Sequence, residues 1–204
     1  MGISKSEGGA GAMSEDNKSD KSITRIKENP DNYIVKERFE IIEGVRYDFL
    51  SSPKINHQIL VSELTTAINI TCHTEGLILF APLDVHFDEA NILQPDIIFI
   101  RNENLHIIND GYIKGVPDLL IEIMSPSSGA IDKVKKKAVY EQFGVSEYWI
   151  VDPHYATVDQ FLLVDDKYQL AATYDNSGKV ESPQLACLSV ELTKMFQAAN
   201  RFGG

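Results

Sequence analysis

The fold is decided by two apolar stretches, Ile92-Leu93-Gln94-Pro95-Asp96-Ile97-Ile98-Phe99-Ile100 and Asp118-Leu119-Leu120-Ile121-Glu122-Ile123-Met124. Each is typical of a buried strand, and each has a carboxylate within it. A buried carboxylate is costly unless it is paired or binds a metal ion. If the two strands are neighbours, Asp96 and Glu122 come close enough to share a divalent cation. The pattern therefore predicts a metal site formed by these two side chains.

Helices and strands follow one another around these two stretches. Residues 55–70 have apolar side chains at a helical period, and residues 132–143 predict a second helix that ends at Gly144. Strands are predicted at residues 39–44, 45–50, 77–87 and 148–153, a hairpin at 158–164 and 168–174, and a last strand at 185–190 before a short C-terminal helix. This order predicts an α/β fold, a mixed β-sheet flanked by helices with an added hairpin near the C-terminus.

The length of 204 residues suits one domain. Residues 1–20 are rich in Gly, Ser, Lys and Glu and have little apolar surface to bury, so we expect a disordered tail or an added leader there. The single folded domain is expected to span residues 21–204. Apolar residues make up 43% of the chain and charged residues 24%, as in ordinary globular proteins.

The cysteine content and the hydropathy of the chain indicate the cellular compartment in which we expect the protein. Cys72 and Cys187 are the only two cysteines, and neither has a metal-ligand neighbour in the sequence. This pattern favours a reducing compartment and no disulfide framework. No apolar run is long enough to span a bilayer, and no secretory signal pattern opens the chain. We therefore expect a cytoplasmic protein without a membrane partner.

The net charge of −11 lies outside the N-terminal segment, because residues 1–30 carry equal numbers of acidic and basic side chains. The excess of acidic residues in the rest of the chain argues against broad, non-specific binding of nucleic acid, which depends on Lys and Arg at the phosphates. A local basic groove or a metal-bridged phosphate remains compatible with it.

A lysine in the second predicted helix is the third candidate site residue. Lys136 shares a helical stripe with Val139, Tyr140 and Phe143, whereas Lys133 and Lys137 are expected to reach solvent. An inward lysine needs a partner, and the two carboxylates are the obvious ones. Its amine would hold the attacking water and stabilise charge developing at phosphorus.

The chain resembles the PD-(D/E)xK nuclease superfamily and, within it, the Uma-two branch of restriction-endonuclease-like proteins. The resemblance is carried by residues 39–44, His57, the Gln94-Pro95-Asp96 segment, residues 122–128, Asp132 with Lys136 and Tyr140, and residues 144–153. It implies a restriction-endonuclease-like fold, a magnesium or manganese ion, and metal ligation by Asp96 and Glu122. It also implies that Asp96, Glu122 and Lys136 are the catalytic residues. Met124 stands where the usual Glu-x-Lys motif has its lysine, and the resemblance to this branch implies that the lysine role moves to Lys136 in the following helix.

Four further residues are candidates for supporting roles: His57, Glu40, Glu43 and Asp132. His57 at the start of a predicted helix could instead cap it or pack against it. Glu40 and Glu43 flank a strand near Gly44, where a solvent-facing or turn role is the plainer interpretation.

The leading hypothesis from the sequence is a metal-dependent phosphodiesterase that acts on DNA as an endonuclease. One alternative is a catalytically silent assembly or regulatory module of the same fold, which the acidic surface and the missing Glu-x-Lys favour. The other is a hydrolase of a small phosphorylated or nucleotide substrate, which needs no long basic groove. A symmetric homodimer is inferred by analogy, because cutting both strands usually takes two active sites.

Overall fold

Two parallel strands, β9 (Leu119–Ile123) and β10 (Glu147–Asp152), form the centre of the largest sheet. The computed structural model describes residues 38–48, 53–125 and 131–201. All of them belong to one unit, residues 37–204. The predicted tail at residues 1–20 and the predicted domain boundary at residue 21 lie outside the described residues.

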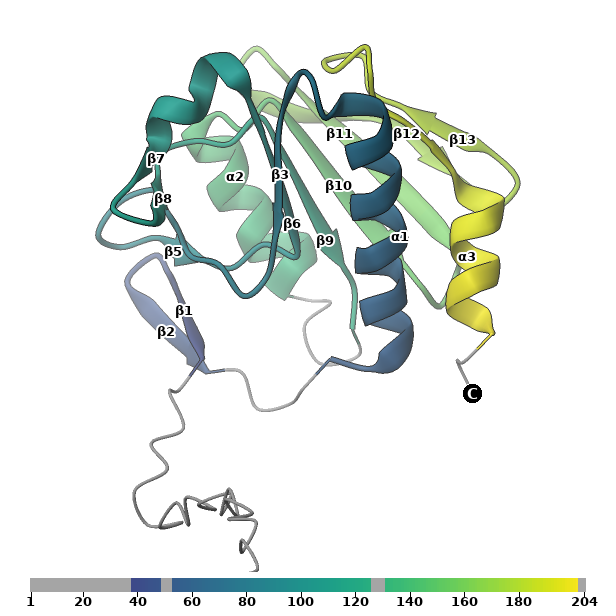
Figure 1. Cartoon of the computed structure of the whole chain (residues 1–204). Coiled ribbons are helices and arrows are strands. Elements are labelled where there is room, and N and C mark those ends of the chain that lie inside the picture. Colours follow the sequence, from purple (N-terminus) through teal and green to yellow (C-terminus); the bar gives the residue numbers. More distant parts are fainter. Residues whose placement is uncertain (1–37, 49–52, 126–130, 202–204) are drawn as a thin grey trace, which may run out of the picture. The chain divides into compact units, whose positions relative to one another are not determined.

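The central sheet has the order β12-β11-β10-β9-β6-β3 (Figure 1). Every neighbouring pair except β9 and β10 is antiparallel, so the sheet is mixed. Its other strands are β3 (Gly76–Phe80), β6 (Ile97–Arg101), β11 (Thr157–Val164) and β12 (Lys167–Tyr174). The predicted hairpin is confirmed as β11 and β12.

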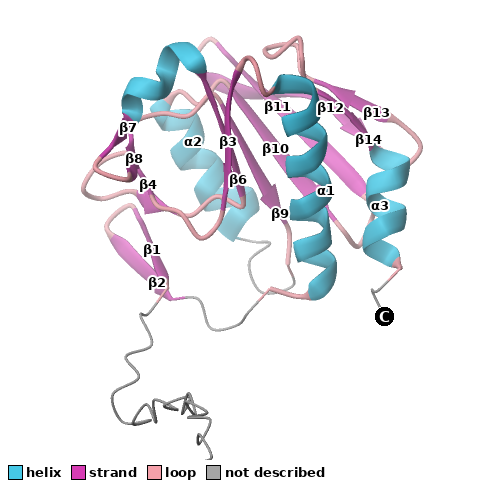
Figure 2. Cartoon of the chain, in the orientation of Figure 1, coloured by secondary structure: helices cyan, strands magenta, loops and turns pink. Residues whose placement is uncertain are grey.

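Helices cover both faces of this sheet (Figure 2). One face packs on α1 (Ile55–Cys72) and α3 (Leu192–Asn200) around a core that includes Trp149. The other face packs on α2 (Lys137–Phe143), which continues from a π-helical turn, η3 (Ile131–Lys136). No helix in the described part of the chain is long and apolar enough to cross a membrane.

Short strands form two smaller sheets. One has the order β2-β1-β5-β4-β8-β7, and the other pairs β13 with β14. Their bounds are β1 (Phe39–Ile42), β2 (Val45–Asp48), β4 (Val85–His86), β5 (Ile92–Leu93), β7 (Ile108–Asn109), β8 (Tyr112–Lys114), β13 (Lys179–Glu181) and β14 (Ser189–Glu191), and a 3-10 helix, η2 (Asn102–Ile107), precedes β7.

The first quoted stretch is not one strand, as its sequence predicts, but two. β5 and β6 belong to different sheets, and residues 94–96 connect them. Pro95 has no N–H to donate to a ladder, so the connection falls where continuous pairing would cost a hydrogen bond. Asp96 therefore lies just before a strand and not in the middle of one. The predicted strand at 77–87 is likewise divided into β3 and β4.

The cysteines correct a second expectation. Cys72, the last residue of α1, is disulfide-bonded to Cys187, and the two Cα atoms are 5.2 Å apart. The expectation of no disulfide framework is therefore wrong. The bond joins residues 115 positions apart in the sequence, a proximity that only the packing of α1 against the C-terminal segment creates. It ties the end of α1 to the segment that leads into β14.

Candidate active site

Asp96 and Glu122 occupy opposite positions on two neighbouring antiparallel strands. Ile97 pairs with Ile121 in the β6–β9 register, so the position before Ile97 lies opposite the position after Ile121. The backbone N–H of Ile123 donates a 2.8 Å hydrogen bond to Oδ2 of Asp96, which holds this carboxylate against the end of β9. The two acids therefore lie side by side at one end of the central sheet.

His57 approaches Asp96 from the first turn of α1. Its Nε2 lies 3.1 Å from Oδ2 of Asp96. The carboxylate accepts there, so Nε2 carries the donated proton. Within the described part of the chain, the buried Nδ1 of His57 has no hydrogen-bond partner. The structure thus brings His57 to the predicted site, and α1 begins at the same end of the sheet as the carboxylates.

Lys136 lies between two buried glutamates. Its Nζ is 2.8 Å from Oε1 of Glu40 and 3.1 Å from Oε1 of Glu122. All three side chains are almost fully buried, with residue exposures of 2% for Glu40, 2% for Glu122 and 3% for Lys136. Such burial is tolerable because the charges are paired and hydrogen-bonded. The helical stripe correctly predicted that Lys136 faces Glu122.

Tyr140, one turn after Lys136, donates a 2.7 Å hydrogen bond to the same Oε1 of Glu122. Burial, together with the charges of Glu122 and Glu40, raises the pKa of Tyr140 well above its ordinary value. The phenol therefore keeps its proton and remains a donor. Lys136 and Tyr140 together fix the orientation of the Glu122 carboxylate from α2 and the turn before it.

The neighbouring lysines behave differently from one another. Lys135 is exposed, and its Nζ lies 4.5 Å from the centre of the Tyr47 ring and contacts the Tyr47 hydroxyl. Lys137 does not simply reach solvent, as the helical wheel predicts, because its Nζ lies 3.7 Å above the ring of Phe161. The side chain of Lys133 lies outside the described residues.

The predicted supporting residues divide into two groups. Glu40 is part of the site, which corrects its expected solvent-facing or turn role. Glu43 is exposed in the β1–β2 turn with a φ of 52°, and its N–H bonds Asn91, so it does not join the other acids. Asp132 belongs to η3, but its side chain lies outside the described residues.

Two features of the site carried a signal that the sequence interpretation did not use. Glu40 shares a strand face with Ile42, which is 1% exposed, so period-two alternation already placed Glu40 on the buried face. Tyr140 lies one helical turn from Lys136, the spacing at which helix side chains share a partner. The backbone N–H of Gln94 also donates a 2.7 Å bond to Oε1 of Glu40 and anchors it to the β5–β6 connection.

The donor set fits a hydrated divalent cation. Magnesium in proteins is typically held by one or two carboxylates, with water and phosphate oxygens as the other ligands. Asp96 and Glu122 meet that requirement, and His57 and Ile123 both contact Oδ2 of Asp96, leaving Oδ1 without a hydrogen bond from any described residue. The described residues contain no cluster of three or more His, Cys, Asp or Glu that could hold a metal. A cation here would therefore keep most of its water.

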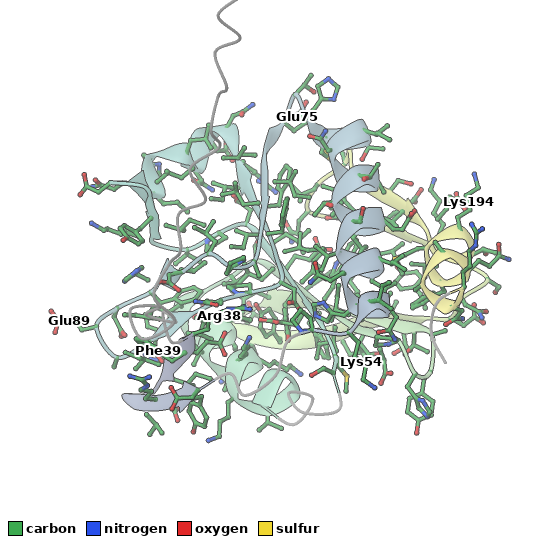
Figure 3. All side chains as sticks on the ribbon, turned by 60° about the horizontal axis from the view of Figure 1, so that its bottom comes forward. Arg38, Phe39, Lys54, Glu75, Glu89 and Lys194 are labelled. Atoms are coloured by element: carbon green, nitrogen blue, oxygen red, sulfur yellow. A yellow bond between two sulfur atoms is a disulfide. The ribbon has the colours of Figure 1, made fainter. Side chains whose placement is uncertain are left out.

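Charge also favours a cation at this end of the sheet. Glu40 and Glu122 flank the ammonium of Lys136, and Asp96 takes the strand position opposite Glu122. Figure 3 looks at this end of the molecule, with Lys54 beside the start of α1 and Arg38 and Phe39 at the start of β1. Lys54 and Arg38 are exposed, and Nη2 of Arg38 donates to Oε1 of Gln94, two residues before Asp96.

Comparison with known proteins agrees with the geometry. The sequence model of the Uma2 family, whose description is "Putative restriction endonuclease", matches residues 34–193. Among solved structures, a "putative nuclease belonging to DUF820" from Anabaena variabilis matches with a TM-score of 0.65 and 21% sequence identity. The match covers 79% of this chain and 90% of that one. At this identity the likeness shows a shared fold. A comparison with curated proteins found no match.

Proposed function

Because the chain belongs to the Uma2 family of restriction-endonuclease-like proteins, we propose that it is a metal-dependent phosphodiesterase that cleaves DNA as an endonuclease. The observation that carries the proposal is the pair Asp96 and Glu122 at opposite strand positions, with Lys136 bonded to Glu122 from the neighbouring helix. Paired carboxylates beside a buried lysine suit metal-assisted phosphodiester hydrolysis.

Asp96 and Glu122 would hold magnesium, or manganese in its place. When bound, the ion polarises the phosphodiester and lowers the pKa of a coordinated water. Asp96 is held for this role by Ile123 N–H and His57, and Glu122 by Lys136 and Tyr140. Rigid placement of this kind matters because small displacements of a reacting group cost much of the rate.

Lys136 would act at the phosphate as well as on Glu122. Its ammonium sits beside the carboxylate that would hold the metal, where negative charge develops on the phosphoryl oxygens during attack. Glu40 balances the lysine on the other side, at 2.8 Å. The amine therefore stays charged and oriented in a buried position, and the supporting role of Glu40 is to keep it so.

The test is metal-dependent cleavage by matched glutamate variants. Glu122→Gln keeps the side-chain shape but removes the charge, so we expect loss of manganese binding by titration calorimetry and loss of DNA cleavage. Glu147→Gln is the control, since Glu147 is also a buried glutamate of the same sheet but lies away from the site. Manganese-stimulated cleavage by Glu122→Gln at the parental rate would refute the proposal.

A second candidate is a catalytically silent module of the same fold. It is favoured by the buried ion pairs, because Lys136 already compensates part of the charge that a cation would otherwise neutralise. Titration separates the two candidates: the enzyme binds manganese in the micromolar to millimolar range, roughly the range of weak carboxylate sites, and the silent module binds none.

The proposal also concerns the oligomeric state of the protein and its cellular location. A homodimer would supply two active sites if both strands of a duplex are cut. We also expected a cytoplasmic location, but the Cys72–Cys187 disulfide opposes it, because cytosolic thiols are kept reduced. Counting free thiols in protein isolated under alkylating conditions decides between an oxidised and a reduced state in the cell.

A further inference from the structure

The end of the central sheet that carries the acids also carries exposed aromatic side chains. In the order β10-β9-β6-β3, Glu122 lies near the end of β9 and Asp96 just before β6. β3 ends at Phe80, one strand beyond Asp96. β10 runs parallel to β9 and is followed at the same end by a turn that contains Tyr155, one strand beyond Glu122. An aromatic residue therefore lies on each side of the acidic pair.

Phe80 is held rigidly next to Asp96. It pairs with Ile97 in the β3–β6 ladder, and the N–H of the next residue, Ala81, donates a 3.0 Å bond to the backbone carbonyl of Asp96. Its side chain is nevertheless 57% exposed. An exposed phenylalanine on a strand fixed to the site has no evident role in the core of this domain.

Tyr155 is presented by a turn that is fixed in a similar way. Oδ1 of Asp152 accepts hydrogen bonds from the N–H groups of His154 at 2.9 Å and Tyr155 at 3.1 Å. The His154 ring packs edge-on against the Tyr155 ring, with 4.7 Å between the centroids. The tyrosine is 74% exposed, the highest exposure among the large hydrophobic residues of the described chain.

We propose that Phe80 and Tyr155 stack on unpaired bases on either side of the scissile phosphodiester, so that the substrate is single-stranded or locally unpaired DNA. This inference rests on the proposed nuclease function and specifies its substrate class. Aromatic side chains bind single strands by base stacking, which is sequence-tolerant because every base has a flat face to stack on. Stacking adds binding energy that does not come from phosphate contacts, which suits a chain of net charge −11.

The spacing of the two aromatic residues supports an unpaired strand. β3 and β10 are three strand positions apart, which is roughly 14 Å at the usual distance between neighbouring strands. Bases stacked in a duplex rise about 3.4 Å each and offer no faces to side chains from outside. An extended single strand has both the reach and the accessible base faces that the two rings require.

The first experiment compares one oligodeoxynucleotide as a single strand and annealed to its complement, with manganese present. We expect the single strand to be cleaved at least about tenfold faster, since the duplex must first be unpaired at a cost of a few kcal/mol. Faster cleavage of the duplex overturns this inference and leaves the nuclease proposal standing. Cleavage of neither substrate under any divalent ion counts against the nuclease proposal itself.

The second experiment tests the stacking residues by fluorescence anisotropy on the labelled single strand, with divalent ions chelated. Phe80→Ala and Tyr155→Ala are each expected to weaken binding by about 5- to 150-fold, the range for loss of one stacked base. Tyr155→Phe should bind as the parent does, because the ring is kept. Leu170→Ala is the control: Leu170 is 55% exposed but lies on β12, at the opposite edge of the sheet.

An abasic substitution in the oligonucleotide distinguishes stacking from a structural effect. If Phe80 stacks on one base, removal of that base weakens binding to the parent, and Phe80→Ala then adds nothing further. An abasic site scanned along the strand should reveal one such position for each aromatic residue. Alanine effects that stay the same at every abasic position, or alanine variants that bind as the parent, overturn the inference.

Discussion

Glu122 and Glu147 are two buried glutamates on neighbouring parallel strands, and they show that burial alone does not mark a functional carboxylate. Glu122 faces α2 near the end of β9, and its oxygen contacts Lys136 and Tyr140. Glu147 begins β10 and contacts neutral donors instead, namely Trp149, Gln160 and Ser182. Both are at most 2% exposed.

The difference lies in how each carboxylate is stabilised. Glu122 accepts from the ammonium of Lys136 and from the Tyr140 hydroxyl. At Glu147, burial raises the pKa of the carboxyl although three side-chain hydrogen bonds act in the opposite direction. Glu147 instead links β10 to β11 through Gln160 and to the C-terminal segment through Ser182. Glu122 thus belongs to a group of charged side chains, whereas Glu147 belongs to a buried network of neutral hydrogen-bond donors.

The largest effect is expected from Lys136→Met, which removes the cation on which this comparison rests. Glu40 and Glu122 would lose their shared ammonium while still buried, at a cost of about 3–5 kcal/mol in the free energy of unfolding. Urea unfolding measures the change. Manganese should restore more stability to this variant than to the parent, because the ion replaces the lost positive charge.

The control for that variant is Lys135→Met. Lys135 is exposed and contacts Tyr47 at the surface, so its loss should change stability by no more than about 0.5 kcal/mol. Equal stabilities of the two methionine variants would mean that Glu40 and Glu122 do not depend on Lys136, and the contrast with Glu147 would fail.

A smaller effect is expected from Tyr140→Phe, which removes one neutral donor from Glu122 and leaves the lysine in place. The hydrogen bond ends on a carboxylate, so its loss should cost about 1.5–3 kcal/mol in the free energy of unfolding. Tyr168→Phe is matched to it, because the Tyr168 hydroxyl donates to the neutral carbonyl of Val145 at 2.9 Å and should cost about 1 kcal/mol. A larger loss for Tyr168→Phe would contradict a charged Glu122.

The sequence was sufficient to place Asp96 opposite Glu122 on neighbouring strands and to turn Lys136 toward Glu122. Strand alternation and the helical stripe are local periodicities, and both follow from the spacing of apolar residues. The break at Pro95 could also have been inferred, because a proline rarely lies within a central strand. Family resemblance then gave these positions a chemical meaning that periodicity alone does not supply.

Other features depend on long-range packing and had no comparable local signal. Cys72 and Cys187 are separated by 115 residues, and only the docking of the C-terminal segment beside α1 brings them together. Glu147 looks like a polar residue at the start of a strand, and its donors come from positions 149, 160 and 182. Neither the disulfide nor the buried neutral network can be inferred from spacing in the sequence.

The smallest effect, and the most specific to Glu147, is a pH dependence. Burial raises the pKa of this carboxyl above 4.5 in the folded protein, so the folded state holds its proton more tightly than the unfolded chain does. The stability that this provides is complete below the unfolded pKa and is lost as the pH rises through the folded pKa, at up to about 1.4 kcal/mol per pH unit.

Glu147→Gln has no such proton. We therefore expect the free energy of unfolding of Glu147→Gln minus that of the parent to rise with pH and then level off. Urea unfolding at pH values below and above the folded pKa measures this difference. A difference that falls as the pH rises would mean that the fold favours the charged form of Glu147, and the contrast between the two glutamates would fail.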